Sequence, residues 1–276
     1  MTQPTISERI KSMEEHLGTK LLDRMGRGVV PTKAGEILYG YAKKILDLKV
    51  EAKQVLENFS TKMTGEITIG GSNIPGGYVI PNLLGKFKEN YPNISIYLRI
   101  GDTKEIINEV LNGRIEMGIV GAKIQDKRFQ YNEFIKDELI LAVSSSHQWG
   151  SRTSIKPGEL KGEPFIMRER GSGTRMTMEK ALHDAGINLN GLRAVAEMGS
   201  TEAVKQGIKA GVGVSILSKR AIENELKFGV LRGITIEGIQ FIRNFYIVLH
   251  KARTQSPLVK AFIRFLLEST SDKRPF

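Results

Sequence analysis

The chain opens with a segment whose apolar residues follow a helical period. Four of them are separated by four, three and four residues: Ile6, Ile10, Met13 and Leu17. This spacing places them on one face of an α-helix. Thr2 is suited to cap that helix, and Pro4 is tolerated in a first turn, where backbone N–H groups lack partners within the helix. The apolar face needs a surface to pack against, and no segment precedes it in this sequence.

A β-hairpin is predicted next. The stretch "LLDRMGRGVVPT" at residues 21–32 has the pattern of a strand, a turn and a second strand, with Arg27 between Gly26 and Gly28 in the turn. A helix followed by a hairpin is typical of the second half of a winged helix-turn-helix, whose helix enters the major groove and whose wing contacts phosphates or the minor groove. The alternative is an ordinary hairpin with a solvated arginine, and Arg27 alone does not decide between them.

A long helix with a narrow apolar seam follows the hairpin. Eight seam residues alternate at steps of four and three: Ala34, Leu38, Tyr41, Ile45, Leu48, Ala52, Val55 and Phe59. Such a heptad pattern is typical of a coiled coil, whereas an ordinary surface helix has a wider apolar face. The seam predicts a helix that dimerises, and packing against the chain's own body is the alternative. Residues 60–64 and Gly65 are expected to end the helix and to act as a hinge.

From residue 65 the pattern alternates between strands and helices. Strands are predicted at 65–72, 93–102 and 114–122, with helices at 78–92 and 103–113. An extended stretch at 129–149 then crosses to a second lobe with strands at 164–169, 192–198 and 212–217 and helices at 174–186 and 201–211. The chain recrosses at 241–250 and ends with a helix around 256–268. Alternation at this spacing implies βαβ units and mostly parallel sheets.

The sequence therefore predicts an α/β fold with two lobes and two crossovers. Lobe I is expected to cover about residues 65–127 and 243–276, and lobe II about 128–242. Two lobes joined in this way form a cleft of the periplasmic-binding-protein type, in which ligands lie between the lobes.

Composition narrows the class of protein. The 276 residues include no cysteine, which excludes disulfides, thiolate metal sites and a cysteine nucleophile. No apolar run approaches the roughly 20 residues that span a bilayer, and the N-terminus lacks the apolar core of a signal peptide, so we expect a cytoplasmic protein. The four histidines are scattered without metal-ligand spacing, and no nucleophile elbow or phosphate-binding P-loop is present. We expect no enzyme activity, no cofactor and no metal.

The charge balance favours an anionic partner. The formal net charge is +11, of which residues 1–62, with 11 basic and 8 acidic side chains, contribute +3. The remaining +8 lies in the α/β lobes, so DNA binding by the first segment does not account for the whole excess. A basic balance attracts polyanions and anionic ligands. The alternative is a basic surface that only water contacts.

Residues 2–36, "TQPTISERIKSMEEHLGTKLLDRMGRGVVPTKAGE", resemble the recognition helix, wing and linker-helix start of LysR-type transcriptional regulators. The shared features are Gln3-Pro4, Ser7, Met13-Glu14-Glu15, Leu17-Gly18, Leu21-Leu22-Asp23-Arg24 and Thr32-Lys33-Ala34-Gly35-Glu36. The order of the later segments extends the resemblance over essentially the whole chain. It implies a partial winged helix-turn-helix at 1–31, a linker and dimerisation helix at 32–62 and a two-lobed effector-binding domain at 63–276.

The resemblance also implies the DNA contacts, which are expected at Thr2, Gln3, Pro4, Thr5, Ser7, Arg9 and Arg27. Family members carry further helices ahead of this point, so the head is expected to be truncated and its DNA binding to be weak or lost. Glu8 departs from the family, because many members place an arginine there. An acidic side chain repels phosphates, although it can accept from a cytosine amino group.

Three places where a strand leads into a helix are candidates for effector binding, because free N–H groups at helix starts point at a ligand. The candidates are Ser72, Asn73 and Ile74, then Ser172, Gly173, Thr174 and Arg175, and finally Ser200 and Thr201. The alternative for each serine or threonine is helix capping without any ligand. Three candidates in corresponding positions favour a ligand site.

The effector is expected to be a small anion held mainly at "GSGTR", residues 171–175. The guanidinium of Arg175 offers paired donors suited to carboxylate, phosphate or sulfate. Glu169 works against this interpretation, because it can pair with Arg168 or Arg170, and Arg175 can instead lie along the helix surface. The main hypothesis is thus a LysR-type, homodimeric or homotetrameric DNA-binding regulator. The alternative is a small-anion binding or sensing module that does not bind DNA.

Overall fold

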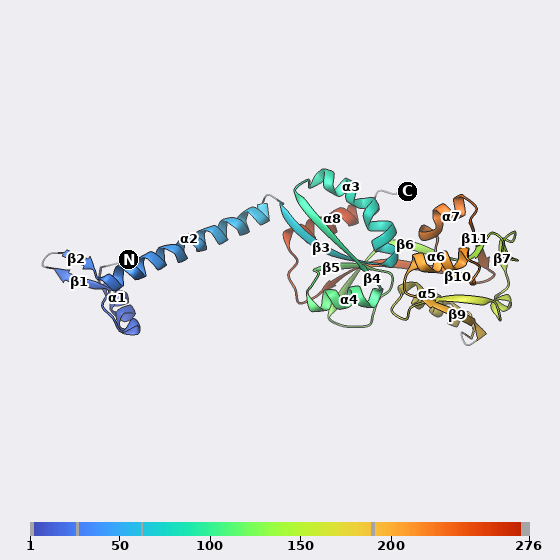
Figure 1. Cartoon of the computed structure of the whole chain (residues 1–276), viewed down its shortest axis with the longest axis horizontal. Coiled ribbons are helices and arrows are strands. Elements are labelled where there is room, and N and C mark those ends of the chain that lie inside the picture. Colours follow the sequence, from blue (N-terminus) through green and yellow to red (C-terminus); the bar gives the residue numbers. More distant parts are fainter. Residues whose placement is uncertain (1–2, 26–27, 62, 189–190, 272–276) are drawn as a thin grey trace. The chain divides into compact units, whose positions relative to one another are not determined.

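The computed structural model describes residues 3–25, 28–61, 63–188 and 191–271 (Figure 1). The chain divides into two compact units, Met1–Lys62 and Met63–Phe276. Among the helices of the described ranges, none combines the length and the apolar character that crossing a membrane requires. Thr2 and Arg27, two of the predicted DNA contacts, lie outside the described residues.

The first unit consists of two helices and a hairpin. Its elements are α1 (Gln3–Leu17), the antiparallel strands β1 (Leu22–Met25) and β2 (Gly28–Pro31), and the long helix α2 (Lys33–Thr61). The helix, hairpin and long helix predicted from the sequence pattern are confirmed. On α1, Ile6, Met13 and Leu17 are each nearly half exposed. The described part of the first unit therefore covers the predicted apolar face only partly.

A buried carboxylate ties α1 to the hairpin. Glu14 accepts hydrogen bonds from the backbone N–H groups of Leu21 (2.8 Å) and Leu22 (3.2 Å) and from Lys20 Nζ (2.8 Å). The hydrogen bond from Lys20, followed by those from the two amides, lowers the pKa of Glu14 to about 2. The charged form of this side chain therefore fixes the corner between the helix and the first strand.

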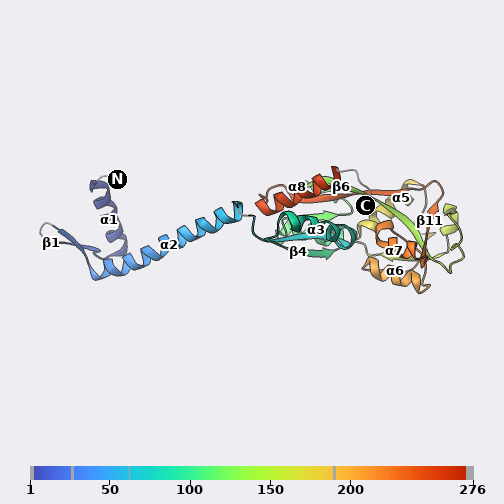
Figure 2. The ribbon, with the colours of Figure 1, turned by 90° about the horizontal axis from the view of Figure 1, so that it is seen from above.

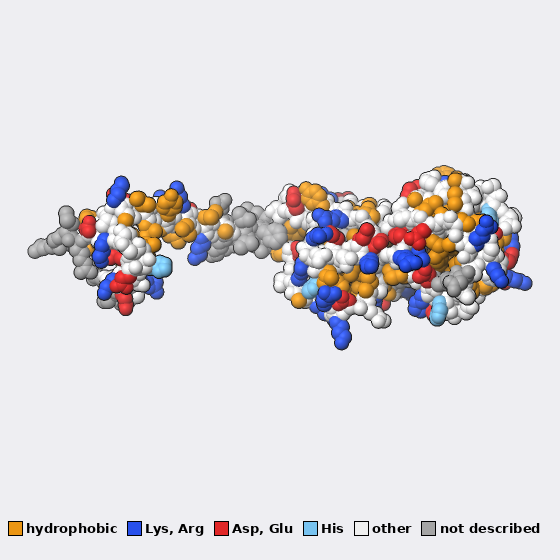
Figure 3. Space-filling view, turned by 60° about the horizontal axis from the view of Figure 1, so that its bottom comes forward, with side chains coloured by type: hydrophobic (Ala, Val, Ile, Leu, Met, Phe, Trp, Pro, Cys, Tyr) orange, Lys and Arg blue, Asp and Glu red, His pale blue; other side chains and the backbone are white. Residues whose placement is uncertain are grey.

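The seam of α2 faces solvent. Tyr41, Ile45 and Leu48 are 63%, 66% and 65% exposed, and Figure 3 shows apolar side chains gathered along the described part of this helix. The side chains of Val55 and Phe59, also predicted in the seam, lie outside the description. Exposed apolar residues at heptad spacing are what a helix needs to pair with a second copy.

Lobe I of the second unit is built on three parallel strands. β3 (Gly65–Ser72) pairs with β4 (Ile94–Gly101) on one side and with β5 (Met117–Val120) on the other. Its helices are the short π-helix η1 (Pro75–Val79), α3 (Ile80–Asn90), α4 (Thr103–Asn112) and α8 (Pro257–Ser271). Figure 1 shows α3 and α8 on one face of the sheet and α4 on the other.

Two long strands join the lobes. β6 (Phe129–Ser144) and β12 (Phe241–His250) are antiparallel neighbours that run from one lobe into the other (Figures 1 and 2). β12 also pairs with β5 in lobe I. In the register of these two strands Arg243 lies directly opposite Asp137. Both crossovers predicted from the sequence are confirmed, and they bring one basic and one acidic residue together between the lobes.

Lobe II repeats the alternation of strands and helices. Its elements are β7 (Ser154–Ile155), η2 (Pro157–Leu160), β8 (Pro164–Arg168), α5 (Gly173–Asp184), β9 (Arg193–Met198), α6 (Thr201–Lys209), β10 (Ser215–Ser218), η4 (Lys219–Ile222), α7 (Glu223–Lys227) and β11 (Leu231–Ile236). β8 and β9 are parallel, while β10 and β11 are antiparallel to β6. Leu141, Trp149 and Phe165 lie in the core of this lobe.

Candidate functional site

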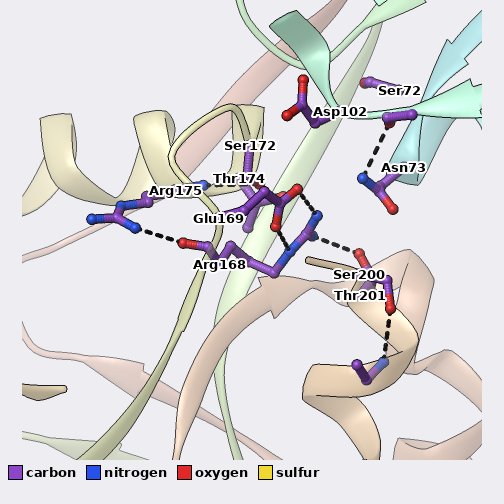
Figure 4. A network of polar contacts seen from close by, with 12 residues as sticks. Ser72, Asn73, Asp102, Arg168, Glu169, Ser172, Thr174, Arg175, Ser200 and Thr201 are labelled. Carbon is purple, nitrogen blue, oxygen red and sulfur yellow. Dashed lines mark hydrogen bonds and ion pairs between the residues drawn. The ribbon is translucent and has the colours of Figure 1, made fainter. Parts of the chain in front are cut away.

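Three helices of the second unit begin where the lobes meet (Figure 4). Each has a polar side chain as its N-cap. Asp102 accepts from the N–H of Glu105 (2.7 Å) at α4, Ser172 from the N–H of Arg175 (3.4 Å) at α5, and Ser200 accepts in the same way at α6. Ser172 and Ser200 therefore cap helices, as the alternative interpretation expected. A ligand at these places must be bound by polar groups that are not used in capping.

A narrow crevice separates the two lobes at these helix starts. Its lining comes from both lobes and from one crossover: Ser72, Asn73, Ile74, Pro75, Asp102, Thr103, Ser172, Gly173, Thr174 and Arg243. Six of the nine predicted effector residues thus meet in one place. The crevice encloses about 10 Å³, which is room for no more than one water molecule. The lobes are therefore closed on each other in this structure.

Two glycines allow the lobes to approach this closely. A Cβ at Gly171 would lie 1.9 Å from Asp102 Oδ2, and a Cβ at Gly173 would lie 2.7 Å from Thr103 Oγ1. Real Cβ atoms do not make such contacts, so the backbone of lobe II can pack against the start of α4 only with glycine at these positions. Gly171 and Gly173, on either side of Ser172, allow the crevice to close because they have no side chains.

The lobe I candidates make hydrogen bonds within their own lobe. Ser72 Oγ accepts from the N–H of Gly121 (3.1 Å), and Asn73 Nδ2 donates to the carbonyl oxygen of Gly101 (3.1 Å). Ile74 is 2% exposed and forms an apolar part of the wall. These contacts hold the lobe I wall in place. The side-chain oxygen of Asn73 is left facing the crevice (Figure 4).

Arg243 is the cation of the crevice. It is 8% exposed, its Nε donates to Asp137 Oδ2 (2.9 Å), and its Nη1 donates to Thr174 Oγ1 (3.2 Å). Burial lowers its pKa, while the neighbouring Asp137 carboxylate opposes that effect. Arg243 was not among the residues predicted from the sequence. Its signal is the one charged residue in the mainly apolar strand pattern "FIRNFYIVLH", matched by Asp137 in the other crossover.

Two polar atoms of the crevice are buried without a hydrogen-bond partner among the described residues: Thr103 Oγ1 and Arg243 Nη2. Nη2 lies 2.8 Å from Asp137 Oδ2, an ion-pair distance. Thr103 is 1% exposed. Arg243 Nη2 is thus engaged by the Asp137 carboxylate, and the hydroxyl of Thr103 remains without a partner among the described residues. Most buried polar groups in native proteins are paired, so this hydroxyl is an unused donor at the lobe boundary.

Arg168, which ends β8 and precedes Glu169, is buried among polar partners. It is 3% exposed, donates to both carboxylate oxygens of Glu169 (2.7 and 2.6 Å), and donates from Nη1 to Thr201 Oγ1 (2.7 Å). The expectation that Glu169 pairs with one of these arginines is met at Arg168. Thr201 belongs to this cluster, Ser200 caps α6, and neither lines the crevice.

Arg175 points away from the crevice (Figure 4). Its guanidinium donates to Glu179 (2.7 Å), to Glu197 (2.7 Å) and to the carbonyl oxygen of Arg168 (2.8 Å). The main anion contact was predicted at Arg175, and the structure does not bring that side chain to the other candidates. Two carboxylates compete for its guanidinium: Glu179, four residues on in the same helix, and Glu197, which comes from β9. Arg243 faces the crevice instead.

In the first unit the predicted DNA contacts lie on α1. Gln3 and Pro4 form its first turn, and Ser7, Glu8 and Arg9 are exposed. Thr5 is half-buried. The acidic Glu8 thus shares the accessible surface with Ser7 and Arg9. No group of three or more histidine, cysteine or acidic side chains in the described ranges is arranged to hold a metal ion.

Comparison with known proteins decides the family. Residues 60–271 match the LysR substrate binding domain, and residues 1–36 match the bacterial regulatory helix-turn-helix protein of the lysR family. The chain belongs to the LysR family. This LysR-type chain is a transcriptional regulator with a DNA-binding helix-turn-helix segment and an effector-binding domain. The resemblance and the two-lobed α/β fold predicted from its sequence are confirmed, and a module without a DNA-binding segment does not fit the match at 1–36.

Relatives of this LysR-type regulator span nearly its whole length. The probable RuBisCO transcriptional regulator of Cyanophora paradoxa is 31% identical over 278 residues, which cover 100% of this chain and 86% of that protein. The regulator CbbR of Rhodospirillum rubrum is 31% identical over 96% of this chain and 87% of its own. The Synechocystis CcmR regulatory domain in complex with 2-PG has a TM-score of 0.69 and 27% identity, covering 76% of this chain and 99% of that one.

Proposed function

We propose that this regulator responds to a small anion with a carboxylate or phosphate group, bound in the crevice between the lobes. The observation that carries the proposal is the buried hydroxyl of Thr103 in the crevice lining, whose Oγ1 has no hydrogen-bond partner among the described residues. A buried donor without an acceptor is costly. An anion placed between the lobes accepts from this hydroxyl and lies beside the guanidinium of Arg243, and hydrogen bonds to a charged group are the stronger kind.

The helix starts around the crevice favour negative charge, whereas the Asp102 carboxylate in the same lining opposes it. Helices α4 and α5 begin at the crevice, and the positive ends of their dipoles stabilise an anion by roughly 0.3–2 kcal/mol. The CcmR regulatory domain was solved with 2-PG, a small anion, which supports the same ligand class here. Because the closed crevice holds about 10 Å³, the lobes open by a hinge motion to admit the effector and remain further apart around it than in this structure.

The proposal also covers the regulator's location, its assembly and its contacts with DNA. We expect it to act in the cytoplasm, where it reaches DNA, and to work without catalysing a reaction. The exposed seam of α2 pairs two copies, which places two helix-turn-helix segments on one operator. The predicted DNA contacts Gln3, Pro4, Thr5, Ser7 and Arg9 lie on α1, which enters the major groove in this proposal.

A threonine-to-valine exchange tests the effector site. Thr103→Val keeps the shape of the side chain and removes the hydroxyl. If that hydroxyl binds the effector, 2-phosphoglycolate binds the variant about tenfold or more weakly, since a hydrogen bond to a charged group contributes roughly 1.5–3 kcal/mol. The melting temperature of the free variant stays equal or rises, because an unsatisfied buried hydroxyl has been removed.

The measurement is isothermal titration calorimetry on the full chain, with thermal unfolding of the same samples. Thr68→Val, a half-buried threonine on β3 outside the crevice, is the control and keeps the affinity of the original protein. Unchanged binding by Thr103→Val, or a loss of stability without ligand, contradicts the proposed role of the hydroxyl.

A further inference from the structure

A second cavity lies between the lobes and shares no lining residue with the crevice. It encloses about 350 Å³, which is within the range of small-molecule sites. Its wall comes from η1 and α3 in lobe I, from the middle of β6, and from α6, η4 and α7 in lobe II. A molecule in this cavity therefore contacts both lobes and a crossover strand.

One side of this cavity is apolar. Val79 and Leu83 of lobe I, Phe134 of β6 and Ala221 of lobe II line it, and each is 8% exposed or less. Aromatic and aliphatic side chains around a space of this size favour a ligand with an apolar body. The two lobes supply these side chains together, so the apolar side exists only while the lobes are near each other.

Two cations reach the cavity, and they differ in how firmly they are paired. Lys205 Nζ lies 2.8 Å from Glu225 and 3.1 Å from Glu202, so its charge is balanced by two carboxylates. Arg220 is held more loosely. Its Nη2 donates to the carbonyl oxygen of Lys136 at 3.3 Å, and its Nε lies 3.7 Å from Asp137 Oδ1.

Asp137 is itself more closely engaged elsewhere. Its Oδ2 accepts from Arg243 Nε at 2.9 Å, and its Oδ1 accepts from Ser218 Oγ at 2.7 Å. Arg220 therefore competes poorly for this carboxylate. A ligand carboxylate that lies against the guanidinium can offer it two parallel, charge-assisted hydrogen bonds, which are stronger than the contacts that it has now.

The acidic side chains of the cavity limit the ligand's charge. Glu223 and Glu225 belong to the lining together with Arg220 and Lys205, so the lining carries as many carboxylates as cations. A phosphate or a dicarboxylate would meet repulsion from these groups, whereas a single carboxylate is matched by Arg220 alone.

We propose that this cavity is a second ligand site, which binds a small monocarboxylate with an aromatic or branched aliphatic body. The body lies against Leu83 and Phe134, and the carboxylate pairs with Arg220. The apolar body distinguishes this ligand class from the small anion proposed for the crevice, and the second site does not depend on the identity of that effector.

Phenylacetate is a suitable probe, and phenylacetamide is its uncharged counterpart. By calorimetry on the full chain we expect phenylacetate to bind with millimolar or tighter affinity and phenylacetamide about tenfold or more weakly. Arg220→Gln is expected to weaken phenylacetate binding by a similar factor, and Arg220→Lys by less, because lysine keeps the charge without the paired donors. The control Lys227→Gln removes one charge from α7 outside the cavity lining and leaves binding unchanged.

The outcomes separate this proposal from that of the crevice. Binding of phenylacetate that survives Thr103→Val and falls in Arg220→Gln supports the second site, whether or not 2-phosphoglycolate binds the protein. No heat or thermal stabilisation with phenylacetate overturns it. Equal binding of acid and amide, or loss of binding in Thr103→Val with retention in Arg220→Gln, also overturns it, since the probe then lies elsewhere.

Discussion

At the scale of single residues, Glu14 gives the first unit a defined dependence on pH. Its carboxylate accepts from Lys20 and from two backbone amides, and its pKa falls from 4.5 to about 2. A group with a lowered folded-state pKa contributes stability that is present above its unfolded pKa. That contribution is lost as the pH falls from about 4.5 through about 2.

We expect Glu14→Gln to loosen the corner between α1 and β1 at neutral pH. The measurement is amide hydrogen exchange in the full chain, in which the N–H groups of Leu21 and Leu22 lose protection because a neutral amide is a weaker acceptor than a carboxylate. Glu15→Gln is the matched control, since Glu15 is exposed and lies 3.8 Å from Lys11. In the original protein the Leu21 amide resonance should titrate near pH 2, and a midpoint above 4 would contradict the assignment.

At the same scale, part of the candidate site could be predicted from the sequence. Ser72, Asn73, Ile74 and Thr174 were found because strand ends and helix starts meet at the same edge of parallel sheets. Arg175 was expected to hold the anion, but its guanidinium faces away from the crevice and pairs with Glu197 of β9, which no local pattern shows. It also pairs with Glu179, which lies four residues on in the same helix and is visible in the sequence. Assigning these side chains to effector contacts remains a prediction.

The crevice cation was missed for a similar reason. Arg243 and Asp137 are 106 positions apart and meet only through the register of β12 and β6. Thr103 was also missed, because a threonine at the start of a helix has the same local pattern whether it caps the helix or faces a ligand.

At the scale of elements, the regular strands and helices were predictable because their apolar residues keep a period of two or 3.6. β11 and α7 were not found, since α7 has only five residues and β11 begins directly after the turn at Gly229. A period needs several repeats before it can be recognised. The missed α7 matters, because it supplies part of the second cavity.

The seam of α2 leads to a prediction about assembly. Ile45 and Leu48 are about two-thirds exposed in one chain. Replacing both by aspartate would place two charges in the pairing surface, at a cost of several kcal/mol unless they find partners. We expect the double variant to sediment as a smaller species, with the circular dichroism of folded α/β lobes.

The control for this experiment is Lys43→Asp, which changes the charge by the same two units on the other side of the helix. That variant should keep the mass of the original protein. If the double variant also keeps it, the copies are joined through other surfaces, and the coiled-coil interpretation of the seam is wrong.

At the scale of the whole second unit, closure of the lobes depends on the contact between Gly171 and Asp102. A Cβ at residue 171 would lie 1.9 Å from Asp102 Oδ2, and Asp102 cannot turn aside without giving up its cap on α4, where Oδ1 accepts from Glu105. Gly171→Ala is therefore expected to hold the lobes slightly apart. The closed crevice, at about 10 Å³, is too small for the effector. An effector that enters only between separated lobes then binds more tightly, because less of its binding free energy is spent on opening them.

We expect Gly171→Ala to raise the affinity for 2-phosphoglycolate by up to about tenfold, which corresponds to roughly 1.4 kcal/mol. Gly199→Ala is the control and should keep the original affinity, since a Cβ there meets nothing within 4 Å, although Gly199 also precedes a helix start between the lobes. Calorimetry on the full chain measures both variants. An affinity of Gly171→Ala equal to or below that of the original protein would show that opening the closed crevice does not limit effector binding.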